Sequence, residues 1–204
     1  MNVTLIDSPV ANVANIARAL RTAGATLDVT KEPRIIASAQ KIVLPGVGSF
    51  IAAMTWLRET AIDDAIRKAV DDGASLLGIC VGHQLLFDVS HEMGTTRGLG
   101  LLRGEVRKFD GPLPVPQIGW NRVLECDGEP PHSKRLFDGV TSGTSFYFVN
   151  SYAVIDSPHT IARADYGRPF AAAAQNGRVF GVQFHPEKSS AAGLRVLRNF
   201  VAWT

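Results

Sequence analysis

Residues 76–82, Leu-Leu-Gly-Ile-Cys-Val-Gly, decide the fold predicted for this chain. A short apolar run ends here in Gly-x-Cys-x-Gly and continues into a second apolar segment, residues 83–89. This pattern is typical of a nucleophile elbow, in which a buried strand turns sharply at the nucleophile and then enters a helix. At a helix N-terminus, free N–H groups and the helix dipole would favour the thiolate form of Cys80. A free cysteine is also often a small buried apolar residue, so the pattern alone leaves both interpretations open.

The residues before the elbow alternate between short apolar runs and helical patterns. The apolar runs predict strands at residues 3–6, 27–29, 42–44 and 75–79, and the 3.6-residue period predicts helices at 12–23, through 54–57 and at 62–70. Gly24 is placed to end the first helix. Alternation of this kind implies an α/β fold with an open, mostly parallel sheet and helices on both faces.

The second half of the chain predicts antiparallel strands instead. Strands are expected at residues 105–109, 122–125, 145–149, 152–155 and 160–164. Asn176-Gly177 predicts a type I′ hairpin between 170–175 and 178–183. A final helix is expected at 189–202, with serines as possible caps. The Pro-rich segment 111–116 is too short for a domain linker and is expected to be a surface connection.

The composition excludes several classes of protein. A length of 204 residues fits one domain spanning 1–204. The net charge is only +2 and the basic residues are scattered, so neither nucleic-acid binding nor a membrane partner is expected. No apolar run is long enough for a membrane span. Two cysteines do not make a disulfide framework, which favours a reducing, cytoplasmic location.

A cysteine nucleophile needs a base and a third group that orients the base. His185-Pro186-Glu187 directly follows the predicted strand and supplies both groups. Active sites of open parallel sheets lie beyond the carboxyl ends of the strands, so Cys80 and His185 are expected to converge. A structural histidine is the alternative; metal ligation is disfavoured because no second cluster has ligand spacing. No metal and no cofactor are expected.

Leu-Pro-Gly-Val-Gly, residues 44–48, is a strand end followed by a glycine-rich turn. Acyl transfer requires N–H donors aimed at the developing oxyanion. The N–H of Val81 is one candidate, and a backbone N–H near Val47 and Gly48 is the other. A simple glycine turn remains the alternative, since the Walker and dinucleotide patterns are both missing.

Two motifs, Gly-Ile-Cys-Val-Gly-His-Gln-Leu-Leu-Phe (78–87) and Gly-Val-Gln-Phe-His-Pro-Glu-Lys-Ser (181–189), resemble those of the class I (triad) glutamine amidotransferases. Three further segments, 44–50, Gly-Trp-Asn (119–121) and 146–152, resemble the glutaminase subunits of imidazole glycerol phosphate synthase. The resemblance extends over residues 1–204. It implies a class I glutamine amidotransferase-like fold that hydrolyses L-glutamine through a Cys80-His185-Glu187 triad.

The resemblance also implies a substrate site and a partner. Gln84, Glu92, Gly46, Ser151 and Tyr152 would hold the glutamine, with Glu92 facing its amino group. The ammonia would pass to a separate (β/α)8-barrel cyclase subunit, which converts PRFAR to imidazole glycerol phosphate and AICAR in L-histidine biosynthesis. The positions assigned to the interface and its coupling are Asn12, Trp120, Asn121, Tyr147 and Lys188. Core packing of the two aromatics, and a solvated charge at Lys188, are the alternatives.

Some residues depart from that subunit family. His83 stands where Met is usual, Gln117 and Asn150 replace histidines, and residues 8–11 lack the usual glycines. None of these changes removes a catalytic group. The competing interpretations are a paralogous glutaminase that feeds another synthase, a Cys-His hydrolase or peptidase, and a non-catalytic interaction module.

Overall fold

A computed structural model describes residues 1–9, 11–126 and 136–203. Its main sheet has the strand order β2-β1-β3-β4-β14-β13-β12-β9, and the first five of these strands run parallel. The bounds are β1 (Asn2–Ile6), β2 (Thr26–Thr30), β3 (Lys41–Gly46), β4 (Ser75–Cys80), β9 (Leu124–Glu125), β12 (Thr160–Asp165), β13 (Pro169–Asn176) and β14 (Val179–Val182). The predicted α/β class, with a mostly parallel sheet extended by antiparallel strands, is confirmed.

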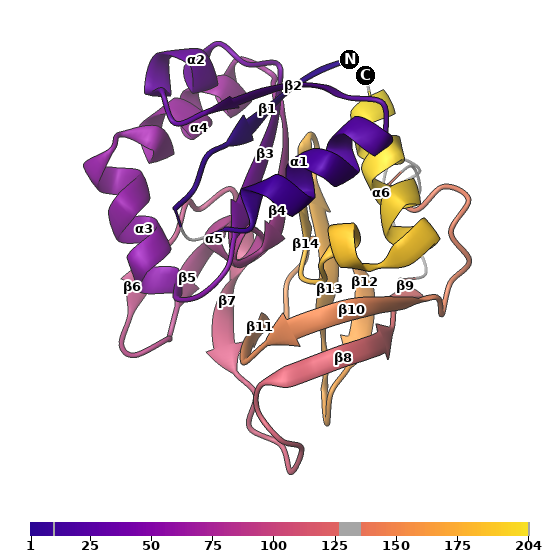
Figure 1. The fold of residues 1–204 in the computed structure, drawn as a ribbon. Helices are drawn as coiled ribbons and strands as arrows, with labels where there is room; N and C mark the ends of the chain where they lie inside the picture. The colour runs from indigo at the N-terminus through magenta and orange to yellow at the C-terminus, as the bar shows by residue number, and fades with distance from the viewer. Residues whose placement is uncertain (10, 127–135, 204) are drawn as a thin grey trace.

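Helices cover both faces of this sheet, as Figure 1 shows. On one face α1 packs against α6, and on the other α4 packs against α2 and α3. The helices are α1 (Val13–Thr22), α2 (Pro33–Ala37), α3 (Phe50–Glu59), α4 (Ile62–Asp71), α5 (Val81–Leu85) and α6 (Ser190–Ala202), with a 3₁₀ turn η2 at Pro186–Lys188. Every residue of β3, β4 and β14 is buried, which explains their continuous apolar sequences.

The remaining strands form two smaller sheets near the carboxyl ends of the parallel strands (Figure 1). One is a ribbon of β8 (Gln117–Arg122) and β10 (Ser145–Asn150). The other contains β5 (Phe87–Ser90), β6 (Thr96–Arg97), β7 (Leu102–Lys108) and β11 (Tyr152–Val154). No helix in the described part of the chain has the length and apolar character needed to cross a membrane.

The apolar segment after the elbow is shorter as a helix than the sequence suggests. Helix α5 ends at Leu85, and Phe87 already begins strand β5. The carbonyls of Leu85 and Leu86 accept hydrogen bonds from the N–H groups of Leu99 and Leu101. These long-range bonds replace the helical ones, so a strand forms where a continuous helix was predicted.

Three smaller expectations are also corrected. The strand predicted at 122–125 is interrupted at Val123, because its N–H and C=O bond to Thr144 and Gly143 rather than to a neighbouring strand. The hairpin forms, but Asn176 pairs with Val179, and of the loop residues only Gly177 has a positive φ, at 56°. A type I′ turn needs two such residues, so that turn type is wrong. Ser189 lies at the N-cap of α6, yet its side chain makes no capping bond.

Candidate active site

Cys80 lies at the turn between β4 and α5, with a positive φ of 55° and a ψ of −111°. Non-glycine residues rarely adopt such angles, and they persist only where the surrounding structure imposes them. The neighbouring glycines allow the backbone to approach closely at this turn. A Cβ on Gly82 would lie 2.0 Å from the Leu44 carbonyl oxygen, and one on Gly78 would lie 2.5 Å from that of Gly82. The sharp elbow predicted from the Gly-x-Cys-x-Gly pattern therefore has a steric basis.

His185 reaches the elbow because β14 is the parallel neighbour of β4. Ile79 lies opposite Val182 in the register, so both strands end at the same edge of the sheet. Three residues further on, His185 turns its ring toward Glu187, and Nδ1 of the ring lies 2.8 Å from Oε1 of the carboxylate. The two side chains are only 4% and 2% exposed. Cys80, His185 and Glu187 are thus brought together as the sequence predicts.

The electrostatics of this cluster favour a charged imidazole. Burial lowers the pKa of His185, but hydrogen bonds and charge from Cys80 and Glu187 outweigh burial and raise that pKa from 6.5 to about 10. An imidazolium next to the sulfur stabilises a thiolate, which is the reactive form of cysteine. Sγ of Cys80 also lies 3.8 Å from the Val149 carbonyl oxygen and 3.9 Å from Nε2 of Gln183. The cluster can therefore carry out nucleophilic attack and proton transfer.

A cavity of about 480 Å³ opens in front of the sulfur. Eleven of the residues singled out from the sequence line it: Asn12, Val47, Gly48, Cys80, Val81, Gln84, Glu92, Ser151, Tyr152, His185 and Lys188. Pro116, Val149 and Asn150 complete the lining. Among described residues, no group of three or more His, Cys, Asp or Glu side chains is arranged to hold a metal ion.

Gly46 does not line this cavity but lies behind the elbow. It pairs with Cys80 across β3 and β4, and a Cβ there would come within 2.8 Å of the Gly82 nitrogen. Its lack of a side chain lets β3 approach the elbow. The following loop, Val47-Gly48-Ser49, connects β3 to α3, and Gly48 has a φ of +82°.

Two polar side chains in the cavity are held by long-range hydrogen bonds. Nε2 of Gln84 donates to the Tyr152 carbonyl at 2.8 Å and to Oε1 of Gln183 at 3.0 Å. Oε2 of Glu92 accepts the N–H of Phe50, the first residue of α3, at 2.6 Å. Glu92 therefore fixes the helix that follows the glycine loop, an interaction that the sequence does not indicate.

The departures Gln117 and Asn150 are cross-strand partners at the end of the β8–β10 ribbon. Both are buried, and each has a side-chain oxygen without a hydrogen-bond partner. Because Gln117 and Asn150 face each other, the two departures from the subunit family change one cross-strand pair. His83, by contrast, lies in the core, where its ring packs on Gly181 and Phe87. Burial lowers the pKa of His83 to about 3, so it is a neutral packing residue outside the cavity.

An outer patch adjoins the cavity and consists of Ile118, Trp120 and Tyr147 of the β8–β10 ribbon together with Lys188 of η2. Ile118 is 64% and Trp120 55% exposed, so Trp120 is not a core aromatic. Its ring packs edge-to-face on Tyr147 at 6.0 Å, and Nζ of Lys188 lies 5.7 Å above the Tyr147 ring. Asn121 instead donates to the Asp165 carbonyl at 2.7 Å, and Asn12 caps α1 by accepting the Asn15 N–H.

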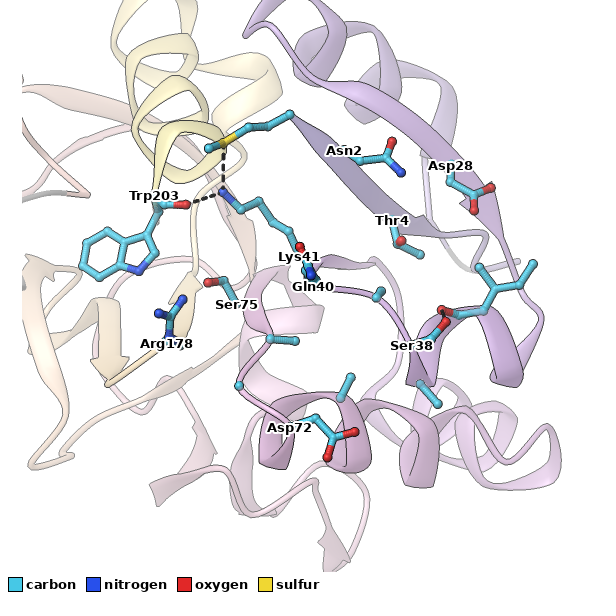
Figure 2. Close-up of a pocket in the computed structure, with 17 residues that line it drawn as sticks. Asn2, Thr4, Asp28, Ser38, Gln40, Lys41, Asp72, Ser75, Arg178 and Trp203 are labelled. Carbon is cyan, nitrogen blue, oxygen red and sulfur yellow. Dashed lines mark hydrogen bonds between the residues drawn. The ribbon is translucent and has the colours of Figure 1, made fainter.

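A second cavity of about 860 Å³ lies at the opposite, amino ends of the parallel strands. Figure 2 shows Lys41 reaching from β3 between the Met1 sulfur and the Trp203 carbonyl. Its amine also donates to the carbonyls of Phe200 and Val201, at 3.1 and 2.6 Å, and so closes the end of α6. The lining of this cavity has no thiol or imidazole, whereas Cys80 and His185 line the first cavity.

Residues 4–203 match the family model described as glutamine amidotransferase class-I. The chain therefore belongs to the class I glutamine amidotransferases, whose activity is glutaminase. Within them, it belongs to the family of imidazole glycerol phosphate synthase subunit HisH. It is 44% identical to that subunit from Salmonella typhimurium, over 98% of this chain and 99% of the relative. It is 42% identical to the subunit from Moorella thermoacetica, over 97% and 93%.

Solved structures agree on the fold. A crystal structure of a glutamine amidotransferase superposes with a TM-score of 0.73 at 20% identity, covering 98% of this chain and 96% of the other. The glutaminase domain of Trypanosoma brucei CTPS, with bound acivicin, gives a TM-score of 0.63 at 14% identity, covering 99% and 92%.

The sequence did not single out Gln183 or Ser189 as site residues. Gln183 is fully buried and lies between Gln84 and the Cys80 sulfur. Ser189 is bonded to the main chain of His185. Both lie within the 181–189 motif, so their closeness to His185 in the sequence could have identified them as site residues.

Proposed function

We propose that the chain is the glutaminase subunit of an imidazole glycerol phosphate synthase and hydrolyses L-glutamine at Cys80, His185 and Glu187. The observation that carries this proposal is the buried His185–Glu187 pair beside a strained cysteine at one end of the sheet. Full-length identity of 44% to a subunit of that name supports the pathway.

In this mechanism the Cys80 thiolate attacks the side-chain amide carbon, and the tetrahedral intermediate collapses as His185 gives its proton to the departing ammonia. The neutral imidazole then takes a proton from water, which attacks the glutamyl thioester and releases glutamate. Glu187 holds the ring and stabilises its charged form, so the same imidazole serves as acid and base. The N–H of Val81, with a second N–H from the loop at Val47 and Gly48, would bind the oxyanion.

Gln84, Glu92, Ser151 and Tyr152 line the same cavity, so they are positioned to hold the glutamine. The partly buried carboxylate of Glu92 suits the substrate's amino group. Gly46 contributes by admitting the β3 backbone to the elbow rather than by lining the cavity.

The ammonia would pass to a (β/α)8-barrel cyclase subunit that docks on the outer patch. Exposed apolar and aromatic side chains that lie together beside a cavity are more typical of a protein–protein interface than of a surface that stays in contact with water. Trp120 and Lys188 both contact the Tyr147 ring there, and Lys188 also lines the cavity. Asn12 reaches the cavity from the N-cap of α1. The Asn121 side chain bonds to the Asp165 carbonyl instead, so its interface role stays a prediction from the family resemblance.

Docking would also control the rate. Losing one oxyanion donor lowers kcat by about 10²–10³-fold, so a loop that presents its N–H only in the complex would act as a gate. Gly48 already has a left-handed φ, which makes rearrangement of this loop sterically feasible.

The test is glutamate release from glutamine by the chain alone, with the cyclase, and with the cyclase and its nucleotide ligand. Weak activity alone and a steep rise only in the full mixture are expected. Strong activity that ignores the cyclase would reassign the chain to another synthase, the paralogous alternative. Absence of any glutamate release would refute the triad.

A further inference from the structure

Ser189 uses its hydroxyl in a way that its position does not predict. It stands at the N-cap of α6 but makes no side-chain cap bond. Instead, its Oγ donates to the carbonyl oxygen of His185 at 2.7 Å and accepts the N–H of Tyr147 at 3.0 Å. The side chain is only 1% exposed, so water does not compete for these two bonds.

Together with a main-chain hydrogen bond, the two bonds of the Ser189 hydroxyl join β10 to the turn that carries His185. The N–H of His185 donates to the carbonyl of Tyr147 at 2.9 Å. Both main-chain groups of Tyr147 are therefore bonded to the 185–189 segment, one directly and one through Ser189. This segment occupies the side of β10 away from β8, where another strand would otherwise pair.

Tyr147 is also part of the outer patch. Its ring packs edge-to-face against Trp120, and the Lys188 amine lies 5.7 Å from the centre of the same ring. A single residue thus has its side chain on the exposed patch and its main chain bonded around His185. Any displacement of Tyr147 must move the His185 backbone or break these bonds.

We propose that Ser189 is a positioning residue for His185, and that its hydroxyl transmits docking at Tyr147 to the imidazole. The second half of this inference rests on the proposed function, because it requires a partner on the outer patch. Ser189 does not line the cavity in front of the Cys80 sulfur. It fixes the main chain from which the imidazole reaches Cys80 and Glu187.

The first experiment uses the chain alone. Ser189→Ala is expected to lower kcat about 10- to 100-fold, since small displacements of a catalytic group have effects of that size. The KM for glutamine should stay within about twofold, because the residues that line the cavity are unchanged. As His185 moves away from its partners its pKa falls, so the alkaline limb of the pH profile moves to lower pH. Ser189→Thr, which keeps the hydroxyl, should recover most of the activity.

The matched control is Ser190→Ala, at an exposed serine next along the chain, and it should leave kcat and the pH profile unchanged. Circular dichroism checks that each variant folds. If Ser189→Ala does not fold, Ser189→Cys, with a weaker donor of similar size, replaces it. Wild-type kcat and pH profile in the folded Ser189 variant would overturn the positioning role.

The second experiment adds the cyclase and its nucleotide ligand. Ser189→Ala should bind the cyclase with wild-type affinity, measured by titration calorimetry, but show a smaller increase in turnover than the wild type. An equal increase would overturn the transmission. If the wild type itself is not stimulated, the proposed partner is wrong and transmission with it, while the measurements on the chain alone still decide the positioning role.

Discussion

Nδ1 of His185 lies 2.8 Å from Oε1 of Glu187, and this contact is almost completely shielded from water. In such surroundings a carboxylate both orients the imidazole and stabilises its charged form. The second oxygen of Glu187 has no hydrogen-bond partner among the described side chains and backbone. Within the described residues, the side-chain hydrogen bonding of this carboxylate is therefore directed at His185.

Glu187→Gln keeps the size of the side chain but removes its charge. We expect the pKa of His185 to fall and kcat for glutamine hydrolysis to drop about 10²-fold or more, as for other general acid–base groups. Glutamate release measured across pH checks this. Glu105→Gln, on an exposed carboxylate paired with Arg107, is the control and should behave as wild type. Wild-type turnover in Glu187→Gln would show that the contact is structural only.

Cys80→Ala should abolish glutamine hydrolysis and leave cyclase binding intact, as expected for the nucleophile. Cys80→Gly should be equally inactive but more stable than Cys80→Ala, because glycine adopts a φ of 55° without steric strain. The difference should be about 1–3 kcal/mol in the free energy of unfolding, measured in urea. Equal stability of the two variants would mean that the elbow stores no strain.

Gly82→Ala is expected to disrupt the elbow. The added methyl would meet the Leu44 carbonyl oxygen at 2.0 Å, and backbone at that distance must move. We expect loss of activity together with a lower melting temperature. Gly111→Ala is the matched control, since its nearest neighbour would be 3.7 Å away. A Gly82→Ala variant as stable and active as the control would contradict this steric account.

Two substitutions of Glu92 can separate its predicted binding of the substrate's amino group from its hydrogen bond to Phe50. Glu92→Gln can still accept the Phe50 N–H but lacks the charge for the substrate's amino group, so KM should rise about tenfold or more with kcat nearly unchanged. Glu92→Ala loses the bond to α3 as well, and kcat should then fall too. Steady-state kinetics of both variants test this. Identical kinetics for Gln and Ala would mean that the bond to α3 has no effect on catalysis.

His83→Met tests the buried histidine. The pKa of His83 is lowered to about 3 in the fold and is near 6.5 in the unfolded chain, so the unfolded state binds the additional proton between these values. Stability from neutral His83 is therefore complete above pH 6.5 and is lost as pH falls towards 3. The expected penalty is about 2 kcal/mol at about pH 5.

His83→Met should remove this acid sensitivity, which urea unfolding at neutral and acidic pH measures, and it should keep wild-type glutaminase activity. If the free energy of unfolding depends equally on pH in both proteins, a group other than His83 is responsible for the acid sensitivity. Lost activity in the folded variant would contradict the assignment of His83 to the core.

The sequence by itself determined the class of fold and the elements that carry the reactive groups. Buried parallel strands need continuous apolar runs, and the turn at Cys80 excludes side chains at Gly78 and Gly82. Both requirements involve only a few neighbouring residues, so a short stretch of sequence is enough to recognise each of them. The succession of the first strands along the chain and the placement of His185 after a strand end follow from the same patterns.

Only the tertiary structure decided which groups bond across the chain. The early end of α5, the use of the Ser189 hydroxyl and the contact of Glu92 with Phe50 each depend on a partner distant in sequence. A serine at a helix start can cap that helix or bond elsewhere, and its local sequence is the same in both cases. Hydrogen-bond partners are chosen by which backbone groups the completed fold leaves nearby, and local periodicity does not contain that information.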